Sequence, residues 1–141
     1  PKVRAQSYSS STSIILNDEW TDNKGQIKDG EIYIPIEFIA SRLNAFITVG
    51  QDITIEKENK ITINLEEKLL HTESGEIIKL NLFFKDDTIM LPLDVLKHLG
   101  YDVVYLKDKL LIRIRNKDAV LTDEQVYVKY KDTLKNEINK I

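Results

Sequence analysis

The sequence predicts one compact, pseudo-symmetric domain of short strands and short helices, followed by a C-terminal helix. Three observations support this prediction. The chain has 141 residues, which suits a single domain. From Ile14 onward its hydrophobic residues recur mostly with a period of two. A strand–proline–helix pattern occurs twice, with the second proline about 57 residues after the first.

Composition excludes several classes of protein. The chain is 42% hydrophobic and 30% charged, which is typical of a globular domain and not of a disordered chain. Its net charge is −3 with lysines and acids mixed, so we expect no nucleic-acid partner. No run approaches the roughly 18 consecutive apolar residues of a membrane span. With no cysteine, disulfides, thiolate metal sites and cysteine nucleophiles are excluded.

Residues 1–13 are polar and rich in serine, which predicts a flexible lead-in. The chain starts at Pro1 without a methionine, so we expect a processed or trimmed fragment whose targeting segment is missing. We expect the main domain over residues 14–116, with pseudo-repeats at about 14–65 and 66–116.

The first repeat begins with a strand at 14–16 and a turn at 17–19. The alternation at 31–34 places Tyr33 on the face opposite its apolar neighbours. Pro35 then suits the first position of a helix, where its missing N–H does no harm. The apolar face expected for this helix consists of Ile36, Ile39, Ala40 and Leu43. Further short strands are expected at 47–49, 53–55 and 61–65.

The second repeat follows a hairpin of 68–72 and 76–80, whose turn ends at Gly75. Pro92 corresponds to Pro35 and opens a second short helix. Gly100 and Asn44 end the two helices, and both residue types tolerate the left-handed conformation found there. The closing strands are expected around Val103 and Tyr105 and around Leu110, Ile112 and Ile114.

Residues 117–141 predict an amphipathic C-terminal helix. Thr122 and Gln125 have the spacing of a capping box. The apolar stripe of this helix consists of Tyr127, Tyr130, Leu134, Ile138 and Ile141. Two interpretations stay open: the stripe folds back onto the domain's own sheet, or it binds a partner protein.

Catalytic chemistry finds little support in the sequence. His71 and His98 are isolated from each other and from any recognised ligand spacing, and we interpret both as ordinary surface histidines. The acid pairs 66–67 and 86–87 fall at expected turns or strand ends, where solvated carboxylates are common. We therefore predict no catalytic residues, no cofactor and no metal site.

Aromatic side chains are the remaining candidates for ligand binding. Trp20 lies in an expected polar loop and Tyr33 on the outer face of its strand, so both are candidates for stacking on sugars. The alternative is that each ring covers a sheet edge or packs against the C-terminal helix. Phe83 and Phe84 are adjacent, so an extended backbone sends one ring to each face.

The doubled pattern carries a resemblance to a known family. Residues 30–40 (GEIYIPIEFIA) and 87–96 (DTIMLPLDVL) resemble the repeated signature of copper amine oxidase N-terminal-like domains, also called stalk domains, over about residues 14–115. The family's arginine is replaced by Glu37 and Asp94, and its tryptophan by Val49 and Tyr105. Any role of that arginine is therefore not carried over to this chain.

The resemblance implies an α+β fold in which an antiparallel sheet wraps around two short helices from the duplicated strand–proline–helix–strand unit. It also implies a non-catalytic module of exported, cell-surface or cell-wall proteins of Gram-positive bacteria. No copper or redox activity is expected, because the histidine cluster and the quinone-forming tyrosine motif of the oxidases are missing. The leading hypothesis is an extracellular stalk, spacer or adhesion module. The alternatives are a cell-wall glycan-binding module and an assembly module that recruits a protein through its terminal helix.

Overall fold

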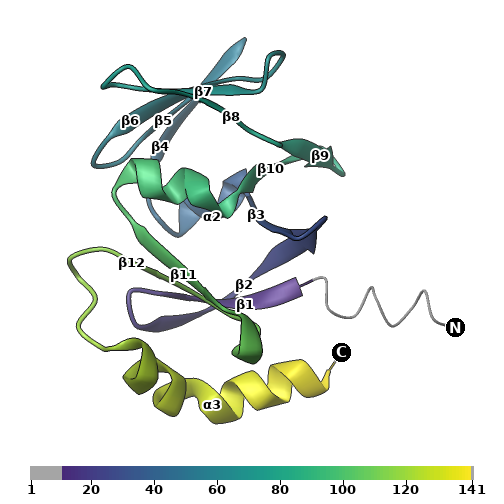
Figure 1. Ribbon diagram of the computed structural model, residues 1–141, viewed down its shortest axis with the longest axis vertical. Coiled ribbons are helices and arrows are strands. Elements are labelled where there is room, and N and C mark those ends of the chain that lie inside the picture. Colours follow the sequence, from purple (N-terminus) through teal and green to yellow (C-terminus); the bar gives the residue numbers. More distant parts are fainter. Residues whose placement is uncertain (1–10, 141) are drawn as a thin grey trace, which may run out of the picture. The chain divides into compact units, whose positions relative to one another are not determined.

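The computed structural model describes residues 11–140 (Figure 1). It is an α+β fold with mostly antiparallel sheets and a C-terminal helix. Its elements, in chain order, are β1 (Ser11–Leu16), β2 (Glu19–Lys28), β3 (Glu31–Pro35), α2 (Ile36–Ser41), β4 (Phe46–Val49), β5 (Asp52–Glu56), β6 (Lys60–Asn64), β7 (Leu69–Thr72), β8 (Ile77–Lys79), β9 (Phe83–Lys85), β10 (Thr88–Pro92), the 3₁₀ helix η1 (Leu93–Leu99), β11 (Asp102–Leu106), the 3₁₀ turn η2 (Lys107–Lys109), β12 (Leu111–Arg115) and α3 (Asp123–Asn139).

The chain divides into two compact units. Among the described residues, unit 1 combines 11–32 and 102–140, and unit 2 is the continuous segment 33–101. In unit 1 the strands lie in the order β11-β12-β1-β2, and β1 and β12 pair in parallel while the other neighbours are antiparallel. Unit 1 also contains α3.

Strand β1 begins at Ser11, earlier than the strand expected from Ile14. Thr12 and Ser13 are buried because β1 is an inner strand between β2 and β12. Their hydroxyl side chains give no apolar signal, and for this reason the sequence pattern does not reveal this part of the strand. The rest of the lead-in, residues 1–10, lies outside the described residues.

Unit 2 contains two groups of strands. One is the antiparallel run β3-β10-β9, and the other is the antiparallel sheet β4-β5-β6-β7-β8. One face of the second sheet is apolar, and it is fully buried at its centre, where Ile53, Ile55, Ile61, Ile63 and Leu70 lie. The opposite face carries a row of directly paired residues, Thr48, Thr54, Thr62, His71 and Ile77. This alternation is the period of two that the sequence predicted.

The two proline-initiated helices differ from expectation in detail. Pro35 is the N-cap of α2 and not its first helical residue, because it still belongs to strand β3. The face of α2 was also predicted wrongly in part: Phe38 is fully buried, whereas Ala40 is exposed. After Pro92 the chain forms a 3₁₀ helix, η1, instead of an α-helix.

Several turn predictions are confirmed. Gly75 lies in the hairpin between β7 and β8 with a φ of 100°, and Gly100 ends η1 with a φ of 95°. Asn44 also adopts a left-handed conformation, with a φ of 55°. Leu110 is left-handed as well and precedes β12, so the closing strand starts one residue later than expected. Phe84 is 60% exposed whereas Phe83 is half-buried, as the extended backbone predicted.

Candidate functional site

In unit 1, apolar contacts, hydrogen bonds and ion pairs gather on the surface against which α3 packs (Figure 1). Ile15 from β1 and Leu111 from β12 form a buried apolar cluster with Val126 and Leu134 from α3. Half-buried side chains surround this cluster: Trp20, Leu106, Leu121, Tyr127 and Tyr130. Packing of this kind is what fixes an amphipathic helix onto a sheet, because the apolar stripe is removed from water on both partners.

Hydrogen bonds hold the start of α3 beside the turn between β1 and β2. The Asp18 carboxylate accepts from the backbone N–H groups of Val120 and Leu121 at 2.6 and 3.1 Å. The Tyr130 hydroxyl donates to the Asp18 carbonyl at 2.7 Å. The predicted capping box between Thr122 and Gln125 is present in both directions. The capping box satisfies N–H groups at the start of α3, and the three bonds to Asp18 attach this start to the turn.

A buried arginine lies under the first turn of the helix. Arg113 of β12 is 3% exposed and forms ion pairs with Asp123 at the start of α3 and with Asp102 of β11, the latter at 3.3 Å. Arg115 reaches the same Asp102 carboxylate at 3.7 Å. A guanidinium ion this deep needs charged partners, since removing them leaves an uncompensated buried charge. Arg113 therefore fixes the first turn of α3 against β12.

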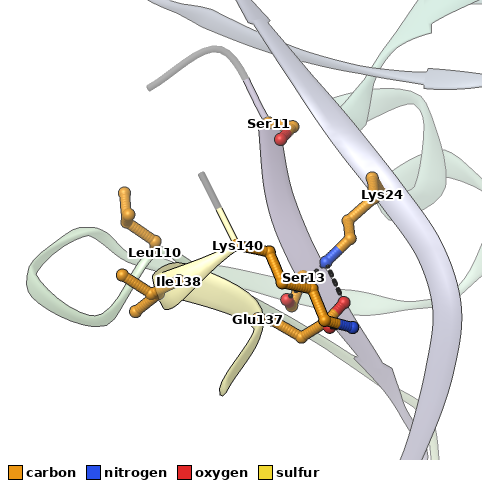
Figure 2. Close-up of a pocket in the computed structure, with 7 residues that line it drawn as sticks. All are labelled: Ser11, Ser13, Lys24, Leu110, Glu137, Ile138 and Lys140. Atoms are coloured by element: carbon orange, nitrogen blue, oxygen red, sulfur yellow. Dashed lines mark hydrogen bonds and ion pairs between the residues drawn. The ribbon is translucent and has the colours of Figure 1, made fainter. Parts of the chain in front are cut away.

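The end of α3 is attached to the sheet by a second set of charges. Figure 2 shows Lys24 of β2 pointing at Glu137, with an Nζ to Oε1 distance of 2.7 Å. Lys24 also donates to the Ser13 hydroxyl, and Lys140 pairs with the other carboxylate oxygen of Glu137 at 2.6 Å. Hydrogen bonds from Lys140 and Lys24 lower the pKa of Glu137 to about 2. The carboxylate therefore stays ionised throughout the physiological pH range.

A small cavity of about 160 Å³ lies beside these charges (Figure 2). Its lining residues come from β1, from β2, from the residue before β12 and from the end of α3: Ser11, Ser13, Lys24, Leu110, Glu137, Ile138 and Lys140. The charged groups of the cavity are already paired with one another, so the arrangement attaches the helix and offers no free group for chemistry.

The two stacking candidates have inward positions in their own units. Trp20 lies in strand β2 and not in the loop that the sequence suggested, and its ring packs on Tyr130 of α3 with a centroid distance of 5.9 Å. Tyr33 is only 4% exposed, and its ring meets Phe83 edge to face at 4.8 Å. The Trp20 ring thus packs against the C-terminal helix, whereas the Tyr33 ring packs against Phe83 of β9.

The residues of the predicted apolar stripe of α3 have different environments. Leu134 is buried, Tyr130 and Tyr127 are half-buried against the sheet, and Ile138 is 37% exposed. Ile141 lies outside the described residues. Val126 is fully buried but was left out of the stripe. Its spacing of four from Tyr130 was the signal that would have identified it.

The histidines and acid pairs do not gather into a site. His71 lies in β7 and His98 near the end of η1. Asp86 and Asp87 form the left-handed turn between β9 and β10. Within residues 11–140, no three side chains of the metal-ligating types lie close enough to hold a metal ion. In the same range no helix is long and apolar enough to cross a membrane.

A polar hollow of about 330 Å³ lies in unit 2, between the turns at the ends of β6 and β7 and the end of η1. It is lined by Asn59, Lys60, Thr72, Glu73, Ser74, Glu76, Lys97 and His98. Two of these side chains already accept backbone hydrogen bonds: Glu73 accepts from the Lys60 N–H at the start of β6 at 3.0 Å, and Thr72 accepts from the Glu76 N–H within the hairpin turn at 3.0 Å. Since these polar groups already stabilise the hairpin, the hollow is explained without a ligand.

Comparison with known proteins identifies the family. The family model described as copper amine oxidase N-terminal domain matches residues 15–114, well over half of the chain. No curated protein and no solved structure matches the chain. The match begins in the last two residues of β1, ends one residue before the end of β12 and covers every element between these two strands. The chain therefore belongs to the copper amine oxidase N-terminal domain family.

Proposed function

We propose that this chain is a non-catalytic stalk or spacer module of an extracellular bacterial protein. The N-terminal domain of copper amine oxidases is a non-catalytic accessory domain, and the family is found in extracellular or periplasmic proteins. The observation that carries the proposal is that the apolar cluster and the buried ion pairs of unit 1 contact other parts of the same unit. The helix stripe, the Trp20 ring and the Arg113 guanidinium all stabilise the module itself.

The family name raises the question of copper. Copper sites in proteins are built largely from clustered histidines. Here His71 and His98 lie in different elements, and residues 11–140 contain no cluster of three metal-ligating side chains. These residues do not fit a copper site, so we derive no chemistry through the metal.

We also propose that the module arose by duplication of a strand–proline–helix unit. Strands β3 and β10 pair antiparallel, with Ile34 opposite Leu91. On either side, Tyr33 lies opposite Pro92 and Pro35 lies opposite Met90. A shift of 57 residues, from Pro35 to Pro92, converts each of these pairs into the other. This symmetric register supports a two-fold relation between the repeats.

The alternative functions receive less support from the geometry. Glycan stacking needs exposed rings, whereas Tyr33 is buried and Trp20 packs on Tyr130. Recruitment of a partner through the terminal helix needs a free apolar face, whereas Leu134 faces the domain's own sheet. The spacer function needs neither.

Cell fractionation tests the proposal. An antibody raised against this chain should detect the full-length protein on intact cells or in the medium. Detection only after lysis, in the soluble cytoplasmic fraction, would contradict an extracellular stalk. Co-sedimentation with purified Gram-positive cell walls separates the glycan-binding alternative. Pelleting that disappears in both Trp20→Ala and Tyr33→Ala would favour that alternative over a spacer.

A further inference from the structure

We propose that β1 and β12 form a shear clamp, which carries tension between the two ends of the chain while unit 2 stays outside the load path. The proposal rests on the spacer function for its biological use, but its physical content concerns unit 1 alone. It identifies the element that would let a spacer remain folded under load.

The clamp is the parallel pairing of the first and last strands. The four residue pairs run from Ser13 opposite Leu111 to Leu16 opposite Ile114. Two further bonds extend this pairing at its ends, from Ser13 N–H to the Leu110 carbonyl at 3.2 Å and from Asn17 N–H to the Ile114 carbonyl at 2.8 Å. Both strands are inner strands of the order β11-β12-β1-β2.

The parallel direction decides how the ladder is loaded. The start of β1 and the end of β12 lie at opposite ends of the ladder, because both strands run the same way. Tension applied at these two points pulls the strands past each other along their length. The evenly spaced bonds of a parallel ladder are then loaded together and must break together. In an unzipping geometry they would break one after another.

Side-chain packing adds to this resistance. Ile14 and Ile15 of β1 and Ile112 and Ile114 of β12 are each 0% exposed. Sliding one strand along the other must displace these side chains from close-packed surroundings. Such interiors contain few voids that could accept the displaced side chains, so the displacement costs free energy. The clamp therefore combines hydrogen bonds with interlocked apolar contacts.

The chain order keeps unit 2 out of the direct path. Unit 2 is the continuous segment 33–101, which leaves unit 1 after β2 and returns before β11. Tension that passes from β1 directly to β12 does not travel along this segment. Unit 2 becomes loaded only after the clamp has broken.

Helix α3 supplies a weaker first step. A pull at residue 140 acts first on the Lys24–Glu137 contact and then detaches the helix turn by turn toward Asp123. The freed segment 116–140 has a contour length of roughly 85 Å at about 3.5 Å per residue, and the 17 residues of folded α3 already span roughly 25 Å of it. Detachment therefore adds at most roughly 60 Å. Only then does the load reach the end of β12 in the shear direction.

Single-molecule pulling tests the clamp directly, because the chain has no cysteine and introduced thiols give unique attachment points. The full chain with Ser11→Cys and Lys117→Cys loads β1 against β12 in shear. The matched control, Ser11→Cys with Asp108→Cys, pulls both strands from the same end and unzips the same ladder. Lys117 and Asp108 are both exposed, so the two handles disturb little packing.

At equal pulling speed, the shear pair should rupture at a several-fold higher force than the unzipping pair. Equal rupture forces would overturn the proposal. If Ser11→Cys prevents folding, a handle at Pro1 replaces it in both variants. Pulling from residues 1 and 141 should give a low-force increase in contour length of at most roughly 60 Å before the main rupture. A single low-force event there would also overturn the proposal. Neither result depends on cellular location, so failure of the clamp and failure of the stalk function are distinguishable.

Discussion

The contact between α3 and its sheet predicts a specific loss of stability when Leu134 is truncated. Leu134 is 3% exposed and packs with Ile15, Leu111 and Val126. Leu134→Ala removes three carbon groups, worth about 2.4 kcal/mol of transfer free energy at about 0.8 kcal/mol each. The cavity left behind adds to this, and measured Leu→Ala losses in cores reach roughly 3–5 kcal/mol. We expect a loss of about 2.5–4 kcal/mol.

Val128 provides the matched control on the same helix. Its side chain is 58% exposed, and alanine is the better helix former. Val128→Ala should therefore leave the free energy of unfolding unchanged within about 0.5 kcal/mol, or raise it slightly.

Urea unfolding followed by circular dichroism and tryptophan fluorescence measures both variants. Trp20 is the only tryptophan of the chain and packs on Tyr130 of α3, so its emission reports directly on the attachment of the helix. The expected result is a lower urea midpoint for Leu134→Ala, with the Trp20 emission shifted toward that of the unfolded chain. Equal midpoints for the two variants would refute the packing of α3 on this sheet.

Three further predictions concern pH, backbone packing and metal content. Hydrogen bonds from Lys140 and Lys24 lower the pKa of Glu137 to about 2, so its stabilising contribution is present above the higher unfolded pKa and disappears as the pH falls toward 2. Glu137→Gln should therefore melt below the parent at pH 7 and together with it near pH 2. At Gly25 an added Cβ would lie 2.6 Å from a side-chain carbon of β12, so Gly25→Ala should lower the free energy of unfolding by about 1–3 kcal/mol. At Gly50 the nearest atom to an added Cβ is 3.8 Å away, so Gly50→Ala should leave the free energy of unfolding unchanged in the same urea titration. After dialysis, elemental analysis of the purified chain should find no stoichiometric copper; a one-to-one content would contradict our account of its histidines.

The strands were predictable wherever one side chain in two is apolar. In β5 and β6 the isoleucines alternate with threonines, and the structure buries the isoleucines on one face. The turns were predictable for a different reason. Gly75, Gly100 and Asn44 are residue types that adopt a positive φ at little cost, and all three do so.

The candidate site was less predictable, because burial in unit 1 depends on a contact distant in sequence. Arg113 alternates with Ile112 and Ile114, which predicts a solvent-facing side chain. It does lie on the opposite face, but the first turn of α3 covers that face and supplies Asp123. Trp20 is similar: its polar neighbours suggested a loop, whereas pairing with β1 makes the segment a strand. The hydrophobic pattern around Arg113 or Trp20 does not reveal which distant segment will cover each side chain.

The physical domain extends beyond the segment that the family model matches. The match ends at residue 114, yet Ile15 and Leu111 are buried in a cluster that includes Leu134. A sheet with these side chains uncovered would expose a contiguous apolar surface, which soluble domains avoid. The Arg113 guanidinium would also lose Asp123, one of its two carboxylate partners. Helix α3 is therefore a structural part of unit 1. Of the two interpretations that its apolar stripe left open, the structure shows packing on the chain's own sheet, against β1 and β12.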